Sequence, residues 1–194
     1  MSLTFRRFTG TEVADVVDEL AHLRIRVFRD WPYLYDGDLG YERRYLQSYT
    51  HRDALVVAAL DGNHIVGAAA GTPLIAHNDD LADAFAGSKL DPDRVFYCAE
   101  SVLLPDWRGQ GAGHVFFDHR ETHARAAGFR HAAFCAVLRP DDHPERPKNH
   151  RPLDPFWRAR GYAPLPGVIA HFKWRDLGKA VETDKPLQFW MRDL

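Results

Sequence analysis

The stretch ESVLLPDWRGQGAG (100–113) decides the fold of this chain. An apolar run ends at Pro105, glycines follow at positions 109, 111 and 113, and a helical pattern extends from about 112 to 127. A glycine inside a helix costs roughly 1 kcal/mol relative to alanine. Glycines on alternate positions at the start of a helix therefore indicate that a ligand must approach the backbone there.

Three sequence patterns are typical of loops that bind phosphate, and only one of them fits this loop. A P-loop needs a Gly-Lys-Ser/Thr ending, and no lysine is present. A dinucleotide fingerprint starting at Gly109 needs a third glycine where His114 stands. The pattern Arg/Gln-x-x-Gly-x-Gly/Ala, after a strand and before a helix, fits residues 108–113 in full. Converging backbone N–H groups and the positive end of a helix would hold an anion, and a Cβ at any of the three glycines would keep a phosphate away. The alternative is a plain tight turn.

The rest of the chain predicts a mixed α/β sheet in one domain, 1–194. Hairpins such as the one around Asp61-Gly62-Asn63 are combined with one strand–loop–helix–strand unit. The predicted elements are strand 3–8, helices 11–28 and 41–49, the hairpin, helix 77–88, strand 94–104, helix 112–127, strand 131–138, a proline-rich loop over 139–155, a short helix in FWRARGY (156–162), and strands 168–174 and 186–192.

The loop, with the strand before it and the helix after it, resembles the pyrophosphate-binding segment of the GNAT acyltransferase superfamily. The order of the elements is similar over nearly the whole chain. This resemblance implies a central mixed sheet of about seven strands flanked by helices. It implies acetyl-CoA or another acyl-CoA as donor, and a strand that splays from its neighbour at a bulge, with 131–138 on the other side of the V. The implied donor contacts are Val102, Leu103, Leu104, and the main chain of Arg108, Gly109, Gln110, Gly111, Ala112 and Gly113.

Acyl transfer to an amine needs an unprotonated nucleophile. A lysine-like amine is neutral in only about one of 10³ molecules at pH 7, so a general base is expected. Glu100, a carboxylate inside an apolar strand, is the candidate, and members of the resembled family often use a glutamate on this strand. Two other interpretations stay open: Glu100 pairs with a nearby arginine, or it faces solvent on an edge.

The remaining catalytic roles are a donor to the oxyanion and an acid for the leaving thiolate. The backbone N–H of Leu103 can serve the first role. For the second, the family often uses a tyrosine four residues before the glycine of the late helix, and here that residue is Trp157. Tyr162 is expected in the core instead. Substitutes, if an acid is needed at all, are Tyr97, Tyr33, Tyr35, His143 and His150.

Composition limits the classes of partner. With 25 basic and 27 acidic side chains the net charge is −2, and no basic cluster stands out, so nucleic acid is not expected. No apolar run reaches the roughly 20 residues of a membrane span. The stretch MSLTFRRFTG lacks an apolar core and a cleavage site, so a signal peptide is not expected. Cys98 and Cys135 are expected as buried free thiols in the cytoplasm.

A metal site is not expected. His119 and His123 lack the zincin spacing, and they share a helix face with apolar residues, which indicates partly buried structural histidines.

The acceptor, a primary amine of a small molecule, amino acid or peptide, is expected to contact the aromatic loop 30–40. Its candidate residues are Tyr33, Tyr35, Asp36 and Asp38, although this loop could equally be packed and solvated.

Three functions are compatible with these features. The first is an acetyl-CoA-dependent N-acetyltransferase. The second is a catalytically silent acyl-CoA-binding sensor, which the departure at Trp157 keeps open. The third is a nucleotide hydrolase or kinase, against which the missing lysine counts. The aromatic strand 186–192 could form the seam of a homodimer, but a buried edge strand explains it equally well.

Overall fold

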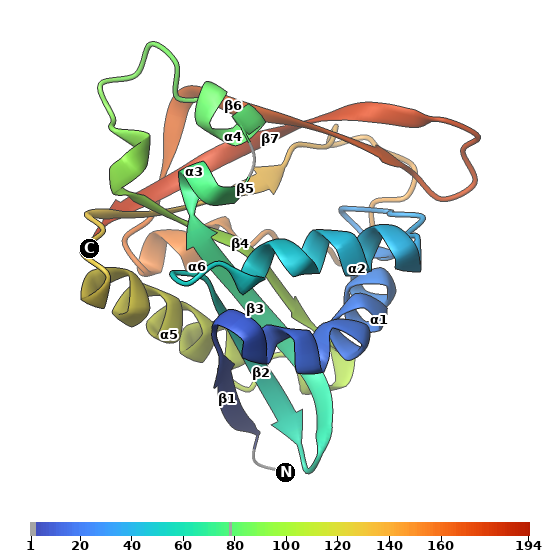
Figure 1. Ribbon diagram of the computed structural model, residues 1–194. Helices are drawn as coiled ribbons and strands as arrows, with labels where there is room; N and C mark the ends of the chain where they lie inside the picture. The colour runs from blue at the N-terminus through green and yellow to red at the C-terminus, as the bar shows by residue number, and fades with distance from the viewer. Residues whose placement is uncertain (1–2, 78) are drawn as a thin grey trace.

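The computed structural model describes residues 3–77 and 79–194. Its centre is one seven-stranded sheet with the order β1-β2-β3-β4-β5-β7-β6 (Figure 1). Only β4 and β5 are parallel, and the other neighbours are antiparallel. The predicted mixed α/β sheet is therefore confirmed. The strands are β1 (Thr4–Phe8), β2 (Leu55–Asp61), β3 (His64–Pro73), β4 (Val95–Leu103), β5 (His131–Val137), β6 (Ala163–Arg175) and β7 (Glu182–Asp193).

The helices follow the predicted order with two differences. The α-helices are α1 (Val17–Phe28), α2 (Leu39–Gln47), α3 (Leu74–His77), α4 (Asp79–Asp83), α5 (Ala112–Ala126) and α6 (Asp154–Ala159). Short 3₁₀ turns are η1 (Gly10–Val16), η2 (Ser48–Thr50), η3 (Pro92–Arg94) and η4 (Pro105–Trp107). The segment predicted as one helix over 11–28 thus begins as a 3₁₀ helix. The helix predicted over 77–88 is wrong in its bounds, since the helical turns begin at Leu74 and end at Asp83.

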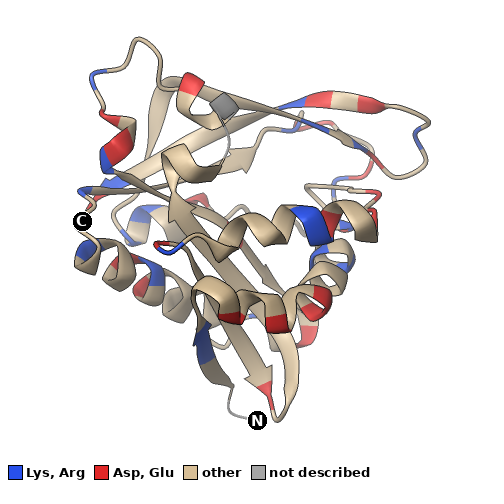
Figure 2. Ribbon diagram, viewed as in Figure 1, with Lys and Arg blue, Asp and Glu red and all other residues tan. Residues whose placement is uncertain are grey.

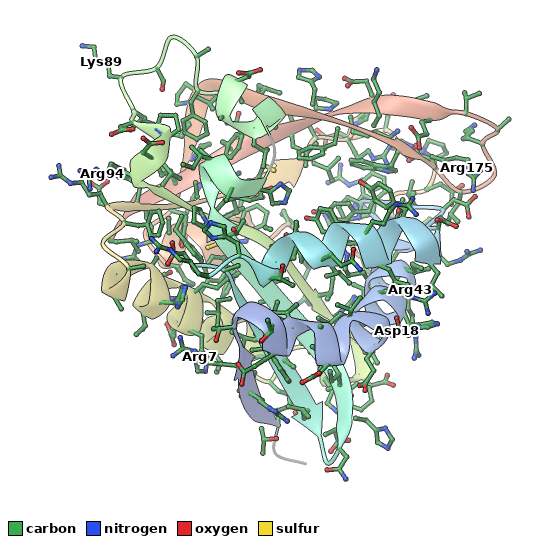
Figure 3. The ribbon with its side chains drawn as sticks, in the orientation of Figure 1. Arg7, Asp18, Arg43, Lys89, Arg94 and Arg175 are labelled. Atoms are coloured by element: carbon green, nitrogen blue, oxygen red, sulfur yellow. The ribbon has the colours of Figure 1, made fainter. Side chains whose placement is uncertain are left out.

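Helices cover both faces of the sheet. Leu20 and Leu46, from α1 and α2, pack with Val56 and other residues of one face. On the other face Phe116 of α5 packs with Val57. Neighbouring residues of β2 thus belong to opposite clusters, as the alternation of a strand requires. In Figure 1, α1 and α2 cross in front of the sheet. Asp18 of α1 and Arg43 of α2, labelled in Figure 3, form an ion pair at 2.7 Å that joins these helices.

The strand β4 parts from β5 soon after the two have paired. Their parallel register covers only Val95 to Tyr97 against residues 131–133, whereas β4 stays paired with β3 up to Leu103. The register with β3 shifts near Gly71, which places one extra residue on β4. Arg120 of α5, only 1% exposed, spans this irregularity by donating to the carbonyls of Ala70 and Glu100. The splayed strands with a bulge, expected from the resemblance, are present.

The β6–β7 hairpin is longer than predicted. The expected strands 168–174 and 186–192 lie inside Ala163–Arg175 and Glu182–Asp193. Pro164 and Gly167 interrupt the sequence pattern, and the register is irregular between Pro164 and Ile169. Because β6 is an edge strand, it tolerates these residues. Arg175, labelled in Figure 3, pairs with Asp36 at 2.8 Å and fastens the hairpin to the loop before α2.

The cysteines, the charged residues and the helices can also be compared with the sequence predictions. Cys98 and Cys135 are buried and free, as predicted. Charged residues of both signs are spread over the ribbon in Figure 2. Within 3–77 and 79–194, no helix has the length and apolar character needed to cross a bilayer. In the same residues, His, Cys, Asp and Glu do not gather in threes at a potential metal site.

Candidate active site

The loop between β4 and α5 presents a row of unused hydrogen-bond donors. Gly109 and Gly111 adopt φ values of +77° and +85°, which L side chains rarely take. Within the described part of the chain, the backbone N–H groups of residues 109–113 donate no backbone hydrogen bond of normal length. Gly111 caps α5, so these donors lie at the positive end of a 15-residue helix. The loop therefore has the geometry of an anion cradle and fits a pyrophosphate.

Gly113 has a different reason for being glycine. A Cβ at this position would lie 3.3 Å from Cζ of Phe156, whereas at Gly109 and Gly111 it would meet nothing within 4 Å. Gly113 therefore lets α6 pack closely on the start of α5. The expectation that all three glycines serve backbone access alone is incomplete, because the third also serves packing.

The free edge of β4 faces the opening between β4 and β5. The N–H of Leu104 donates to the carbonyl of Val66 on β3 at 2.9 Å. Because successive residues of a strand alternate, the N–H of Leu103 points to the opposite edge. The carbonyl of Leu103 accepts from Nε of Arg108 at 3.0 Å, which fixes the turn into the loop. The side chains of Val102 and Leu104, also predicted as donor contacts, are buried in the cluster under α1, so they can reach a ligand only through main-chain atoms.

Glu100 lies in a buried ionic cluster between β4 and the two N-terminal helices. Its Oε1 lies 2.5 Å from Nη1 of Arg24, and its side chain is 7% exposed. Arg24 also donates from Nε to Glu42 at 2.5 Å. The hydroxyls of Tyr45 and Tyr49 donate to Oε2 of Glu100 at 3.1 and 3.2 Å. Of the interpretations left open by the sequence, pairing with an arginine is the observed one, and solvent exposure is excluded.

Burial and neighbouring charges shift pKa values in this cluster. Burial disfavours the guanidinium of Arg24, yet Glu100, Tyr45 and Glu42 together hold its pKa well above the ordinary value. Burial, followed by the charge of Glu100, raises the pKa of Tyr45, so this side chain stays a neutral phenol. Two carboxyl groups face one guanidinium, so acidic groups outnumber basic ones in this cluster beneath α2.

A cleft of about 500 Å³ lies directly against this cluster. It is lined by Tyr41, Tyr45, Ser48, Ile75, Ala76, His77 and Phe172, which come from α2, η2, α3 and β6. Nε2 of His77 lies 3.0 Å from the Tyr45 hydroxyl, and Nδ1 is buried without a partner among the described residues. Tyr45, which lines the cleft, thus connects its wall to Glu100 by a hydrogen bond.

His77 should make the stability of the folded protein depend on pH. Burial lowers its pKa to about 4 from an ordinary 6.5, against the opposing charge of Glu100. Between these values the unfolded chain binds a proton that the folded chain does not, so stability falls as the pH drops through this window. By pH 4.5 the loss should reach about 2–3 kcal/mol.

Urea unfolding at pH 7 and pH 4.5 measures this loss. We expect wild type to lose about 2–3 kcal/mol more than His77→Gln over this interval, since other titrating groups are common to both. Glu100, Tyr45 and Tyr97 face the imidazole and remain in the variant. Equal pH dependence in the two proteins would refute the assignment.

The predicted acceptor residues have structural partners of their own. Tyr33 packs on Phe28 with ring centroids 4.5 Å apart, and Tyr35 forms a bridge with Asp176. Asp36 pairs with Arg175, and Asp38 accepts from the N–H of Tyr41 at 2.7 Å as the N-cap of α2. None of the four candidates lines the cleft. Their role in binding an acceptor stays a prediction.

The candidate acids are equally occupied. Trp157 packs between Phe134 and Trp190 with centroid distances of 4.9 and 5.1 Å. Tyr162 is buried and donates to Glu121, so the expected core position is confirmed. The Tyr97 hydroxyl lies 2.9 Å from Sγ of Cys135. His143 and His150 both contact the ring of Trp31. His119 and His123 are half-buried, as expected.

Sequence reasoning missed most of the cluster around Glu100. Glu42, Tyr45 and Tyr49 recur at helical spacing on the buried face of α2 and η2, together with Leu46. A carboxylate within such an apolar stripe signals a buried partner, and Arg24 occupies the same kind of position on α1. That signal was available. The contribution of His77 was not, because only the folded chain brings α3 against α2.

Comparisons with known proteins identify a family and several structures of similar fold. Residues 22–147 match the sequence model of the Acetyltransferase (GNAT) family. A ribosomal-protein-alanine N-acetyltransferase from Brucella melitensis has a TM-score of 0.60 at 13% identity, with 98% of this chain and 99% of that chain covered. A phosphinothricin acetyltransferase from Sinorhizobium meliloti, solved with acetyl-CoA, has a TM-score of 0.59 at 17% identity, covering 100% and 89%.

The PaiA N-acetyltransferase from Thermoplasma acidophilum, solved with coenzyme A, has a TM-score of 0.55 at 9% identity. The match covers 100% of this chain and 100% of that chain. No curated protein matches the sequence.

Proposed function

We propose that this chain, which belongs to the GNAT family of acetyltransferases, transfers an acetyl group from acetyl-CoA to a primary amine of a small molecule, amino acid or peptide. The observation that carries the proposal is the row of free N–H groups over 109–113, at the end of a strand that has parted from its parallel neighbour. The strand β4 and the loop after it thus present an unpaired strand edge next to an anion-binding site. Acetyl-CoA is a long phosphorylated thioester and can use both.

The residues of β4 and the loop divide the work of binding the donor. The N–H groups of 109–113 hold the pyrophosphate, each charged hydrogen bond contributing about 1.5–3 kcal/mol. The open edge of β4 offers main-chain atoms to the pantetheine arm. The N–H of Leu103, turned to that edge, would receive the negative charge that develops on the acyl oxygen. The donor itself supplies an activated acetyl group.

Glu100 serves as the proton acceptor through a relay. The carboxylate of Glu100 is not part of the cleft wall, but Tyr45 is a lining residue, and its hydroxyl donates to Oε2 of Glu100. As the acceptor amine loses a proton to the Tyr45 oxygen, the phenol passes its own proton to Glu100. The phenol remains neutral throughout, in keeping with its raised pKa.

A second candidate function rests on the Arg24–Glu100 ion pair. A carboxylate held by a guanidinium and two phenols can be purely structural. In that case the chain would bind acyl-CoA without turnover, as a sensor.

A product assay separates the two. The purified protein is titrated with acetyl-CoA by calorimetry and then incubated with a panel of primary amines, with thiol release and product mass followed together. Micromolar binding with acetylated product is the expected result. Binding without product from any amine identifies the sensor, and absence of binding refutes both functions.

A further inference from the structure

The cleft beside the ionic cluster has an unusual wall for an amine site. Its lining combines aromatic and aliphatic side chains with the polar groups of Ser48 and His77, and none of the lining residues is Asp, Glu, Lys or Arg. Tyr41 and Ile75 form an apolar rim, each about half exposed at 50% and 51%. In Figure 2 the α3 helix carries no charged segment. An apolar body would lose water against the aromatic and aliphatic part of this wall, and none of its lining residues is a lysine or arginine that could pair with an anion.

The base of the cleft favours a cation. Two carboxyl groups, from Glu42 and Glu100, share the guanidinium of Arg24 one tyrosine away, in a buried setting where water screens little. The faces of Tyr41 and Phe172 add an attraction for an ammonium group. His77 does not oppose a cation, since it is neutral at pH 7.

His77 also offers the one directed contact. When the Tyr45 hydroxyl donates its single proton to Glu100, Nε2 of His77 carries the proton of the bond to the Tyr45 oxygen. Nδ1 is then an acceptor, and it is buried without a partner in the described part of the chain. An amine N–H that reached this nitrogen would satisfy it.

We propose that the acceptor is a primary amine with a single positive charge on an apolar body, and that it carries no carboxylate beside the amine. The amine donates to Nδ1 of His77, and the body lies between Tyr41, Ile75 and Phe172. This inference rests on the proposed function and narrows it, because it excludes free amino acids. A carboxylate placed here would be desolvated without a cationic partner, above two carboxyl groups that share one guanidinium.

Three probes with the same phenylethylamine body test this. 2-Phenylethylamine, phenylalanine and phenylalaninamide differ at the carbon beside the amine in bearing nothing, a carboxylate or a neutral amide. We expect kcat/KM for phenylethylamine to exceed that for phenylalanine at least a hundredfold, about 3 kcal/mol. Phenylalaninamide should lie within about tenfold of phenylethylamine, about 1.4 kcal/mol, which assigns the effect to charge.

A charge introduced at the rim should reverse this preference. Ile75→Arg gives a carboxylate a partner and repels an ammonium group, and the exposed position tolerates the longer side chain. The ratio of phenylethylamine to phenylalanine should fall at least tenfold. Val181→Arg, at another exposed apolar residue outside the cleft, is the matched control and should leave the ratio unchanged.

Failure of this inference and failure of the proposed function give different results. Equal use of phenylalanine, or acetylation of polycationic or peptide amines alone, overturns this substrate class while leaving the acetyltransferase intact. Lack of acetyl-CoA binding overturns the proposed function itself. An unchanged ratio in Ile75→Arg shows that the acceptor does not occupy this cleft.

Discussion

Replacing Glu100 with glutamine should lower kcat at least a hundredfold while leaving acetyl-CoA affinity within about twofold, since general base catalysis contributes about 10²–10⁴-fold. The substitution keeps the shape of the side chain, and the amide oxygen can still accept from Tyr45 and Tyr49. It removes the group that takes the proton. Steady-state rates with the best amine of the panel measure the loss, and calorimetry measures the affinity.

The pH profile distinguishes a base from a structural carboxylate. Without a base, the variant depends on amine that is already neutral, so its rate should rise about tenfold per pH unit up to the pKa of the amine. The wild-type rate should level off earlier. If the rate of the Glu100→Gln variant is reduced by the same factor at every pH, Glu100 is not the general base.

Glu42→Gln is the matched control for charge. It removes one carboxylate from the same cluster and contacts the same guanidinium, but it leaves Glu100 and its two phenols in place. We expect a loss of at most about tenfold and a wild-type pH profile. An equal loss in both variants would mean that the net charge of the cluster, rather than the position of Glu100, sets the rate.

Replacing Gly111 with glutamate should weaken acetyl-CoA binding at least a hundredfold. Its φ of +85° imposes strain of about 1–2 kcal/mol on a side chain, but a Cβ would meet nothing within 4 Å, so the fold should persist. The new carboxylate would compete for the free N–H groups of the loop and repel the pyrophosphate. Loss of two charged hydrogen bonds corresponds to about 3–6 kcal/mol. Calorimetric titration with acetyl-CoA provides the measurement.

Gly128→Glu is the control for strain and charge. Gly128 has the same φ of +85° and the same open space, but it follows the other end of α5. This variant should bind acetyl-CoA like wild type. If Gly111→Glu binds equally well, the loop is a plain tight turn, and the donor site must be sought elsewhere.

Local patterns were sufficient for the elements that surround the loop. Two apolar runs around a Gly-Asn turn specify the β2–β3 hairpin, and alternate glycines after Pro105 specify the entry into α5. Such features depend on neighbours in sequence, whose conformational preferences are short-range. The bounds of β6 could not be predicted this way, since Pro164 and Gly167 argue against a strand except at the edge of a sheet.

Local sequence patterns were enough to predict the order of the elements, the glycine loop before α5, and a carboxylate within an apolar strand. Only the tertiary structure decided what that carboxylate touches. Arg24, Tyr45 and His77 are separated from Glu100 by between 23 and 76 residues of chain, and they meet because α1, α2 and α3 are packed against β4. Burial of charge is a property of that assembled environment. A side chain's partners, its pKa and the shape of an adjoining cleft are set by atoms that are distant in sequence, and no local pattern contains them.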